Sequence, residues 1–406
     1  MVSRNGTFVL SMIISIFLFQ APIVYNTKND IVPVVTFHLK DKSRGDLSIS
    51  TRYDSFVGNP VSPQNIFLPI VAKSKDNFIA YIGYDHNIWI IRPDGTGKRQ
   101  LTTDAKSSKY LYDMESGYSQ LRWSPDGQFL GAVRRDGTNS AILMINITSY
   151  QITTLISGVQ GTYDWLPDNN AIIFADGPYE PYDAGNYPSG LSTFNILTRQ
   201  VTKFLSPEPG YRLVSPDWAP MGNAGYFSVE PVPRPMGIWE PDTGFWSTGS
   251  SSYQILPSVG ALECSWATDG LRMLCTNYYG EGHDVVLWMF NNSGQVIGYV
   301  PSGQVSGYAA KQAWSRDGIW IAYRRDPLYT SAPVYIDIQK LENGSWFQYK
   351  RIYQDVFPMA WSLDNQHLLV EDQYSTSGSP RFLILDIETS NTVQLFQGIE
   401  ATWQPY

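Results

Sequence analysis

Short apolar runs separated by turn residues recur along the chain from residue 66 onward. The runs are rich in β-branched and aromatic residues, as in AILMIN at 141–146 and FLILD at 382–386, and each is followed by Gly, Pro, Asn or Asp. No part of 66–406 shows the sustained 3.6-residue apolar period of an amphipathic helix. The pattern therefore predicts an all-β chain.

A repeat that opens on a tryptophan organises these runs. Six segments place a Trp before a tight turn and a strand: W123-SPDGQFLGAV, W165-LPDNNAIIF, W218-APMGNAGYF, W266-ATDGLRMLC, W314-SRDGIWIAY and W361-SLDNQHLLV. Their tryptophans are 42, 53, 48, 48 and 47 residues apart. In the turn, Pro fixes one φ angle, and Asp-Gly or Asp-Asn supplies the positive φ that a tight hairpin needs.

Each repeat holds one strand before the Trp turn and three after it. Four-stranded units of this length are typical of β-propeller blades. Tight turns near Asp76, Asp126, Asp168, Met221, Asp269, Asp317 and Asp364 predict a single propeller of about seven blades. Six or eight blades remain alternatives, because the first copy, which begins at Ala72, is degenerate. We expect 398–403 to supply the innermost strand of the first blade and to pair with the strand around 78–82, which would close the ring.

The segment NIWIIRPDGTGKRQLT, followed by LRWSPDGQFLGAV, resembles the repeats of TolB-type, WD40-like (PD40) propellers. The resemblance covers roughly 72–406 and implies a propeller fold and a bacterial origin. Such repeats also form the non-catalytic propeller of dipeptidyl-peptidase and prolyl-oligopeptidase families. The sequence contains no G-x-S-x-G nucleophile elbow, so we expect no peptidase activity. The fold itself does not indicate a function.

The N-terminal segment has the pattern of an export signal. Arg4 precedes an apolar run from Phe8 to Phe19, and a run this short is typical of a signal-peptide core. We therefore predict a signal peptide or N-terminal anchor at 1–25, a polar linker at 26–65 with short strand-like pieces, and the propeller at 66–406. Cleavage stays open, and residues 8–24 could tether the protein to a membrane. In either case the protein would be periplasmic, extracellular or on the cell surface.

Charge and histidine content exclude several classes of function. The net charge is −8 and no Lys/Arg cluster occurs, so we expect no nucleic-acid partner. The four histidines are scattered; we interpret His86 and His283 as solvated loop residues and expect no metal site and no cofactor. Asp176, Glu180 and Asp183 could bind Ca²⁺, but their spacing matches no calcium loop, and a solvated loop is the preferred interpretation.

The strand order places the irregular loops and the crossings between blades at the end opposite the Trp turns, which we call the loop end. Tyr118, Tyr211 and Tyr308 each follow a Gly near this end. They would form either an aromatic collar for sugars or extended peptide, or packing between blades. Charged pairs end several second strands and are either ligand-binding groups or solvated loop ends: Arg134 and Arg135, Arg324 and Arg325, Glu371 and Asp372.

These features favour a non-catalytic binding or scaffold module of the cell envelope, whose partner is a protein segment or a glycan. The alternative is a polysaccharide lyase or glycosidase with two carboxylates at the channel mouth. The candidate carboxylates for it are Glu230, Glu281, Glu371 and Asp372. No catalytic residue is assigned.

The two cysteines, Cys264 and Cys275, flank the turn after the fourth of the six repeat tryptophans, Trp266. A two-residue loop at Asp269-Gly270 would place the two cysteines directly opposite each other on neighbouring strands. A disulfide is then feasible if the pair is of the closer, non-hydrogen-bonded kind. The alternative is two buried apolar thiols.

Overall fold

The computed structural model describes most of the chain, namely residues 33–41, 46–53, 77–107, 114–137, 139–159, 161–178, 189–233, 241–260, 264–277, 286–300, 312–325, 333–373 and 380–405. The chain divides into two compact units, Met1–Ile70 and Val71–Tyr406. In the first unit, β1 (Pro33–Asp41) pairs antiparallel with β2 (Asp46–Tyr53), a hairpin within the range expected to be a linker. The predicted signal segment lies outside the described residues. Within these residues, no helix is long and apolar enough to cross a bilayer.

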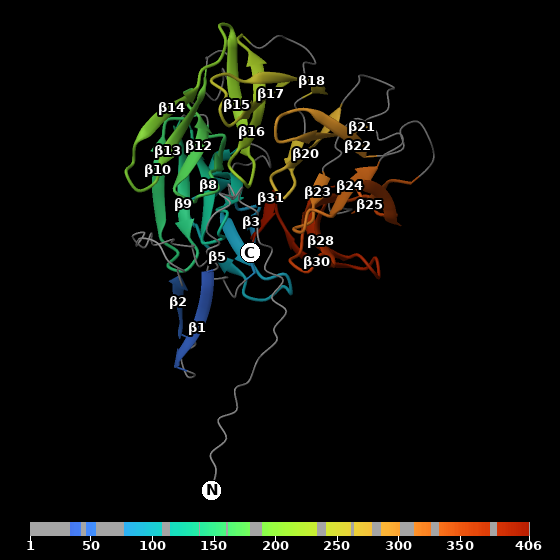
Figure 1. Cartoon of the computed structure of the whole chain (residues 1–406). Helices are drawn as coiled ribbons and strands as arrows, with labels where there is room; N and C mark the ends of the chain where they lie inside the picture. The colour runs from blue at the N-terminus through green and yellow to red at the C-terminus, as the bar shows by residue number, and fades with distance from the viewer. Residues whose placement is uncertain are drawn as a thin grey trace. The chain divides into compact units, whose positions relative to one another are not determined.

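The second unit is all-β, and its described residues form seven sheets, the blades of a propeller, of which six have four strands and one has a short fifth (Figure 1). From the innermost strand outward, blade 1 contains β31 (Glu400–Trp403), β3 (Ile79–Ile82), β4 (Ile88–Ile91) and β5 (Arg99–Gln100). Blade 2 contains β7 (Met114–Trp123), β8 (Phe129–Asp136), β9 (Asn139–Asn146) and β10 (Ile152–Ser157), with a short β6 (Lys106–Ser107) beside β7. Blade 3 contains β11 (Tyr163–Trp165), β12 (Ala171–Ala175), β13 (Leu191–Asn195) and β14 (Val201–Leu205).

The other four blades repeat this strand order. Blade 4 contains β15 (Tyr211–Trp218), β16 (Ala224–Pro231), β17 (Asp242–Ser247) and β18 (Gln254–Gly260). Blade 5 contains β19 (Cys264–Trp266), β20 (Arg272–Asn277), β21 (Val286–Asn291) and β22 (Val296–Val300). Blade 6 contains β23 (Gln312–Trp314), β24 (Trp320–Arg325), β25 (Tyr335–Glu342) and β26 (Ser345–Ile352). Blade 7 contains β27 (Phe357–Trp361), β28 (His367–Asp372), β29 (Arg381–Asp386) and β30 (Thr392–Gln397).

The predicted all-β propeller and its closure are confirmed. The C-terminal β31 pairs antiparallel with β3, from Ile79 opposite Trp403 to Ile82 opposite Glu400, so the red end of the chain lies beside the blue start of the ring (Figure 1). Blade 1 thus takes its innermost strand from the far end of the sequence. The pairing removes the two open edges that an unclosed ring would expose.

The turns after the repeat tryptophans share one geometry. In blade 5 the N–H of Gly270 donates to the carbonyl of Ala267, and Gly270 has a φ of +63°. The same position carries a positive φ in Gly127, Asn169, Gly222, Gly318 and Asn365. This is a four-residue loop with one left-handed residue, so the expectation of a two-residue loop was wrong, although the strand register that it implied is unchanged.

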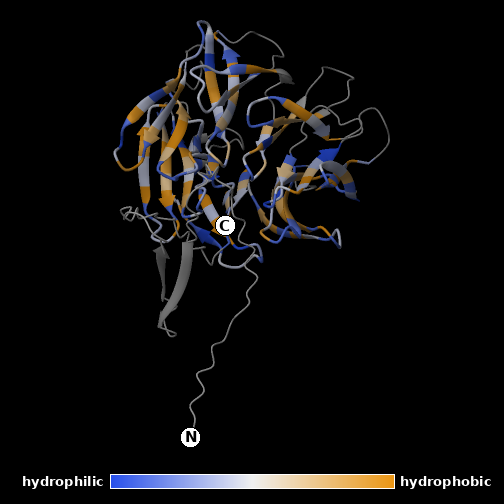
Figure 2. Cartoon of the chain, viewed as in Figure 1, coloured by the Kyte–Doolittle hydropathy of each residue, from blue (hydrophilic) through white to orange (hydrophobic). Residues whose placement is uncertain are grey.

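Apolar burial occurs between blades rather than within one central core. Each cluster of buried side chains joins two neighbouring blades; one, for example, packs Ile79 and Tyr81 of blade 1 against Phe382 and Phe396 of blade 7. Figure 2 shows the apolar stretches along the strands and the more polar turns between them. Because each blade packs on its two neighbours, the ring is stable only when every junction is complete.

The repeat tryptophans also bond neighbouring blades through their indole N–H groups. Trp165 donates to the carbonyl of Arg122, Trp314 to that of Ser265 and Trp361 to that of Ala313. Each acceptor is the residue just before the tryptophan of the preceding blade. Trp123 donates in the same way to Thr402, so the closing strand is joined to blade 2 as the other blades are joined to each other.

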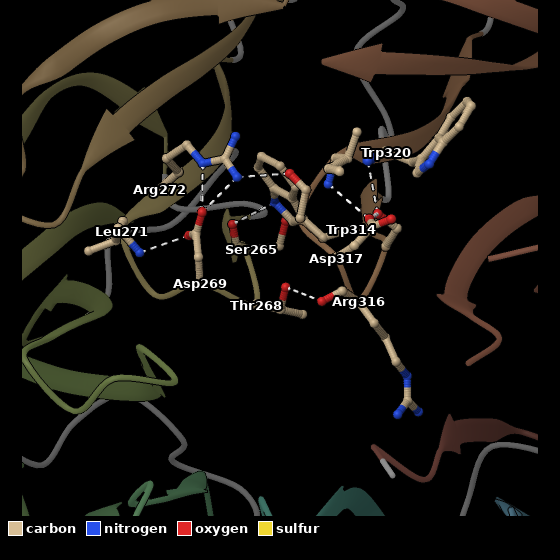
Figure 3. A network of polar contacts seen from close by, with 12 residues as sticks. Ser265, Thr268, Asp269, Leu271, Arg272, Trp314, Arg316, Asp317 and Trp320 are labelled. Atoms are coloured by element: carbon tan, nitrogen blue, oxygen red, sulfur yellow. Dashed lines mark hydrogen bonds and ion pairs between the residues drawn. The ribbon is translucent and has the colours of Figure 1, made fainter. Parts of the chain in front are cut away.

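Figure 3 shows how the Trp turns add further bonds at the junction of blades 5 and 6. Thr268 donates its hydroxyl to the carbonyl of Arg316, and Arg272 bonds both Asp269 of its own turn and the carbonyl of Gly318 in the next. The Arg316 side chain extends away from this network, and its guanidinium donates to the carbonyl of Gln404 in blade 1. Turn-to-turn contacts thus tie together the end of the ring that carries the Trp turns.

The cysteines lie opposite each other on β19 and β20, as the predicted register requires. Cys264 pairs with Cys275 and Trp266 with Met273. The bond from the Ala267 N–H to the Arg272 carbonyl makes that pair hydrogen-bonded, so the alternation of pairs makes 264 and 275 a non-hydrogen-bonded pair. The two Cα atoms are 4.0 Å apart and the structure joins the sulfurs in a disulfide.

We expect thiol titration of the unreduced, denatured protein to find no free thiol. Replacing both cysteines by Ser should lower the free energy of unfolding by at most about 2–3 kcal/mol, because the closed loop is short. Two titratable thiols per chain would rule out the bond. If the bond is absent, the double Ser variant should be about as stable as the unreduced parent.

Candidate functional site

The loop end carries a series of ion pairs, and most of the predicted charged residues belong to it. Arg134 at the end of β8 lies 2.9 Å from Asp104, which is in the crossing from blade 1. Arg324 at the end of β24 lies 2.7 Å from Asp355 in the crossing to blade 7, and its guanidinium stacks on Phe357. Asp372 at the end of β28 accepts a bond of 2.7 Å from Arg381. These charged residues are thus paired with one another, although Arg134, Asp104 and Asp355 keep between a third and a half of their side chains exposed.

Several of these charged groups are buried. Arg325 lies 3.2 Å from Asp337, a residue that is 1% exposed and is also bonded by Arg351. Glu371 is buried at the end of β28, paired across the strands with Phe357. Arg135 ends β8 beside Arg134 and is partly buried. Burial of such groups is favourable only with close partners, so the pairs fix the strand ends in place.

The predicted carboxylates of a catalytic pair are largely committed to these contacts. Glu230 is buried and accepts two bonds from Arg212, one of them 2.8 Å long from Nε. Asp372 is held by Arg381. Glu281 lies outside the described residues. Each of these Arg–carboxylate contacts lies within one blade, Arg212 with Glu230 in blade 4 and Arg381 with Asp372 in blade 7.

The tyrosines of the proposed collar do not form one class. Tyr118 is 3% exposed, packs in the cluster between blades 1 and 2, and donates its hydroxyl to Asp104 over 2.7 Å. Burial and the neighbouring Asp104 raise the pKa of Tyr118 above its ordinary value. Tyr211, at the start of β15, is 37% exposed. Tyr308 lies outside the described residues.

We expect Tyr118→Ala to lower the free energy of unfolding by about 3–5 kcal/mol, because it empties a core site and leaves Asp104 without its hydroxyl donor. Tyr211→Ala should change it by less than about 1 kcal/mol. Chemical denaturation of the two single variants decides the point. Equal losses would contradict the division into one packing and one surface tyrosine.

A second polar site, which the sequence analysis missed, lies where the innermost strands of blades 2, 3 and 4 approach one another. It consists of Arg122, Asp164, Asp217, Tyr163 and Tyr226, which we call the axial cluster. Nη1 of Arg122 lies 3.3 Å from Asp217 and 3.8 Å from Asp164. The two carboxylate oxygens are therefore at most about 7 Å apart, close enough for the two groups to act as a pair.

Local backbone geometry holds the axial cluster together. A bulge in β7, where Gln120 has a φ of +55°, turns the N–H groups of Gln120 and Leu121 toward the carboxylate of Glu400. The hydroxyl of Tyr163 donates to the carbonyl of Gln120 over 3.1 Å. Gly131 permits this, because a Cβ atom at that position would meet the Tyr163 hydroxyl at 2.3 Å. The N–H of Trp218 donates to Asp164 over 2.7 Å.

The two carboxyl groups share one guanidinium, so the cluster has one more acidic group than basic groups. Burial raises the pKa of Asp164 to about 7, with Asp217 adding to the shift and Arg122 opposing it. Burial also raises the pKa of Asp217, again against Arg122. Asp164 is thus partly protonated near neutral pH.

The signal that could have revealed the cluster is the position just before the repeat tryptophan. In blades 2, 3 and 4 that residue is Arg122, Asp164 and Asp217, whereas in blades 5, 6 and 7 it is Ser265, Ala313 and Ala360. Equivalent positions of a closed ring lie at the same height around its axis. Charged residues at this position in three consecutive repeats could therefore have been predicted to lie close together.

The histidines do not gather into a metal site in the part of the chain that the structure describes, where no set of three His, Cys, Asp or Glu side chains could hold an ion. His86 is 3% exposed, so its interpretation as a solvated residue is wrong; burial lowers its pKa, although Asp85 opposes the shift. Asp176, a possible calcium ligand, is paired with Lys203 at 2.6 Å. Glu180, Asp183 and His283 lie outside the described residues.

Comparison with solved structures shows similarity to other propeller proteins. An oligogalacturonate lyase in complex with manganese has a TM-score of 0.54 and 13% identity, over 89% of this chain and 99% of that one. The oligogalacturonate lyase of Vibrio parahaemolyticus has a TM-score of 0.52 and 12% identity, over 90% and 100%. TolB from Acinetobacter baumannii has a TM-score of 0.46 and 16% identity, over 81% of this chain and 66%, just under two thirds, of that one. No protein-family model matches the chain, and neither does any curated protein. At these identities the comparisons show the fold alone.

Proposed function

We propose that this protein is an exported, non-catalytic binding module of the cell envelope that grips a protein segment or a glycan at its loop end. One observation carries the proposal. Ion pairs with at least one partly exposed partner recur at that end in several blades, including Arg134 with Asp104 and Arg381 with Asp372. Charged groups that are held in place before a ligand arrives lose little conformational entropy on binding it. The resemblance of the repeats to those of TolB-type propellers is part of the same proposal.

A labelled sample of the full chain, screened on arrays of envelope-type glycans and peptides, tests the proposal. Arg134→Ala should weaken the strongest binding by about tenfold, the loss typical of a charge that contacts ligand. Lys340→Ala is the matched control, since Lys340 is also half-exposed and paired, with Glu342, at the turn end of β25. Equal effects of both substitutions, or no binding to either array, would overturn the proposal.

The axial cluster favours one second candidate, an enzyme that acts on polysaccharide. Asp164 could donate a proton while Arg122 favours the ionised form of Asp217, the division of roles that two-carboxylate glycoside cleavage needs. Incubation with acidic and neutral polysaccharides, followed by assays for new reducing ends and for unsaturated uronates, tests this candidate. Activity that Asp164→Asn abolishes would support the enzyme. No activity on any of the polysaccharides would leave the binding module as the function.

A further inference from the structure

A groove opens between blades 7 and 1 at the end of the ring that carries the Trp turns. Two adjoining hollows, of about 380 and 460 Å³, share Pro93, Asp94, His367 and Ile384. The first also reaches Leu363 and Trp403, and the second reaches Asp386 and Val393. We call this the seam groove, because it lies beside the junction where β31 closes the ring. Both volumes are in the range of ligand pockets.

The floor and rim of the seam groove are apolar. Leu363 is 48% exposed and Val393 is 63% exposed, and Ile384 lies between them against the cluster that joins blades 7 and 1. Exposed apolar side chains that line a recess are typical of a surface that a partner covers.

Acidic groups line the same groove. Asp94, Asp364 and Asp386 border it, and each accepts hydrogen bonds from its own turn on Oδ1. Hydrogen bonds from Thr96 lower the pKa of Asp94, and those from Thr389 lower that of Asp386. For Asp364, burial opposes the shift, but the bond from Ser362 and further hydrogen bonds outweigh it and lower the pKa. All three are therefore ionised at neutral pH.

A histidine and an arginine lie close to these carboxylates. His367 is placed between Asp364 and Asp386, with ring nitrogens 3.6 and 3.7 Å from their oxygens. Arg92 acts on Asp94 and lies over the ring of Phe78. Three carboxylates thus face at most two positive charges, so the groove keeps a net negative charge.

One of these negative charges exceeds what the fold needs. The turn after β29 matches the turns after β9 and β13, in which Asn146 and Asn195 accept the same backbone bonds that Asp386 accepts from Thr389. Each of these turns then ends on a residue of positive φ: Tyr150, Arg199 and Ser390. An amide fulfils the structural role in blades 2 and 3, and the charge appears only where the turn borders the groove. The charge is thus available for recognition.

From this geometry we infer that the seam groove binds an extended polypeptide segment in which a lysine or arginine neighbours an apolar residue. The apolar side chain would cover Leu363, Ile384 or Val393. The cationic side chain would bond the outward oxygens of Asp94 and Asp386. Two adjoining hollows suit a segment of several residues rather than a single amine. The site is at the opposite end of the ring from the proposed ligand-binding loops, so it is independent of them.

Fluorescence anisotropy with a labelled peptide of alternating Lys and Leu tests the inference, using the full chain. Asp94→Asn/Asp386→Asn should weaken binding by about tenfold or more, since two charge-assisted contacts are lost. The matched control is Asp126→Asn/Asp168→Asn, which removes two charges from the Trp turns of blades 2 and 3. It should keep at least half of the affinity.

A second variant tests the apolar contact without touching any turn. Val393→Lys, at an exposed position of β30, should also weaken binding of the Lys–Leu peptide while leaving the melting temperature unchanged. Three results would overturn the inference: equal losses in the control pair, equal binding of a Glu–Leu peptide, or competition by free lysine amide at the same concentration as the peptide.

Discussion

Removal of residues 398–406 should destabilise the whole ring rather than only its last strand. The deletion removes β31, which pairs with β3 along its full length. It also removes Glu400 from the N–H groups of Gln120 and Leu121, and the carbonyl that accepts the indole bond of Trp123. Blades 1, 2 and 7 lose packing together, because Trp403 and Ala401 belong to the cluster between blades 7 and 1.

The expected loss is at least about 5 kcal/mol in the free energy of unfolding, since deletion of one buried tryptophan alone costs about 3–5 kcal/mol. For a domain of this size, the melting temperature should fall by on the order of 10 °C. Differential scanning calorimetry of the truncated and full-length proteins measures the shift.

Removal of Pro405 and Tyr406 alone is the matched control. It keeps Gln404, whose side chain accepts from the Phe78 N–H and donates to the Gly127 carbonyl. This shorter truncation should melt within about 2 °C of the parent, because β31 and the contacts of Gln404 are kept. If the longer truncation behaves in the same way, ring closure by β31 contributes little to stability.

Most of the fold follows from local sequence rules. The Pro-Asp-Gly and Asp-Asn turns fix where each hairpin reverses, and the tryptophan before them fixes which strand is innermost. The first strand of the degenerate first repeat was placed correctly, because the terminal copy at Trp403 needed a partner, whereas its predicted turn near Asp76 lies outside the described residues. The error at Asp269-Gly270 was one of turn type: a single positive φ at Gly270 is enough for the four-residue loop.

The candidate site was less predictable, because it depends on side chains from different blades. Sequence alone shows that Arg134 and Arg324 end their strands, but Asp104 and Asp355, their partners, lie in crossings whose path depends on the closed ring. The axial cluster arises from three repeats at once. Its charged residues are visible only when equivalent positions of successive blades are compared.

The stability of the protein should depend on pH through the axial cluster. An unfolded chain ionises Asp164 near its ordinary pKa of 3.8, whereas the folded protein does so at about 7. Between these pH values the folded state holds the additional proton, so the contribution of Asp164 to stability falls as pH rises from about 4 to about 7 and is constant above that. The contribution to stability instead rises with pH for the three groove carboxylates, Asp94, Asp364 and Asp386. Their pKa values are lowered in the folded state, so they stabilise it once they are ionised.

Because these opposing groups also titrate, the test compares a variant with the parent at each pH. Asp164→Asn keeps an oxygen to accept the Trp218 N–H and leaves Arg122 paired with Asp217 alone. At pH 8 the variant should be more stable than the parent by about 1–3 kcal/mol, and the difference should shrink toward pH 4. Urea denaturation from pH 4 to pH 8 measures it. Asp168→Asn, four residues along in the exposed turn of the same blade, is the control and should show no such trend.

Replacement of Arg122, the cation that both carboxyl groups share, should destabilise the protein at pH 8, where Asp164→Asn stabilises it. In Arg122→Met, the carboxyls of Asp164 and Asp217 lose the guanidinium that lowers both of their pKa values. Both would then hold protons to higher pH, so the variant should lose more stability at pH 8 than at pH 5, by about 2 kcal/mol or more. The double variant Arg122→Met/Asp164→Asn should recover part of that loss, because one of the two uncompensated carboxylates is gone. A loss of the same size at every pH would show that Arg122 acts by packing, and that the axial cluster does not titrate as a unit.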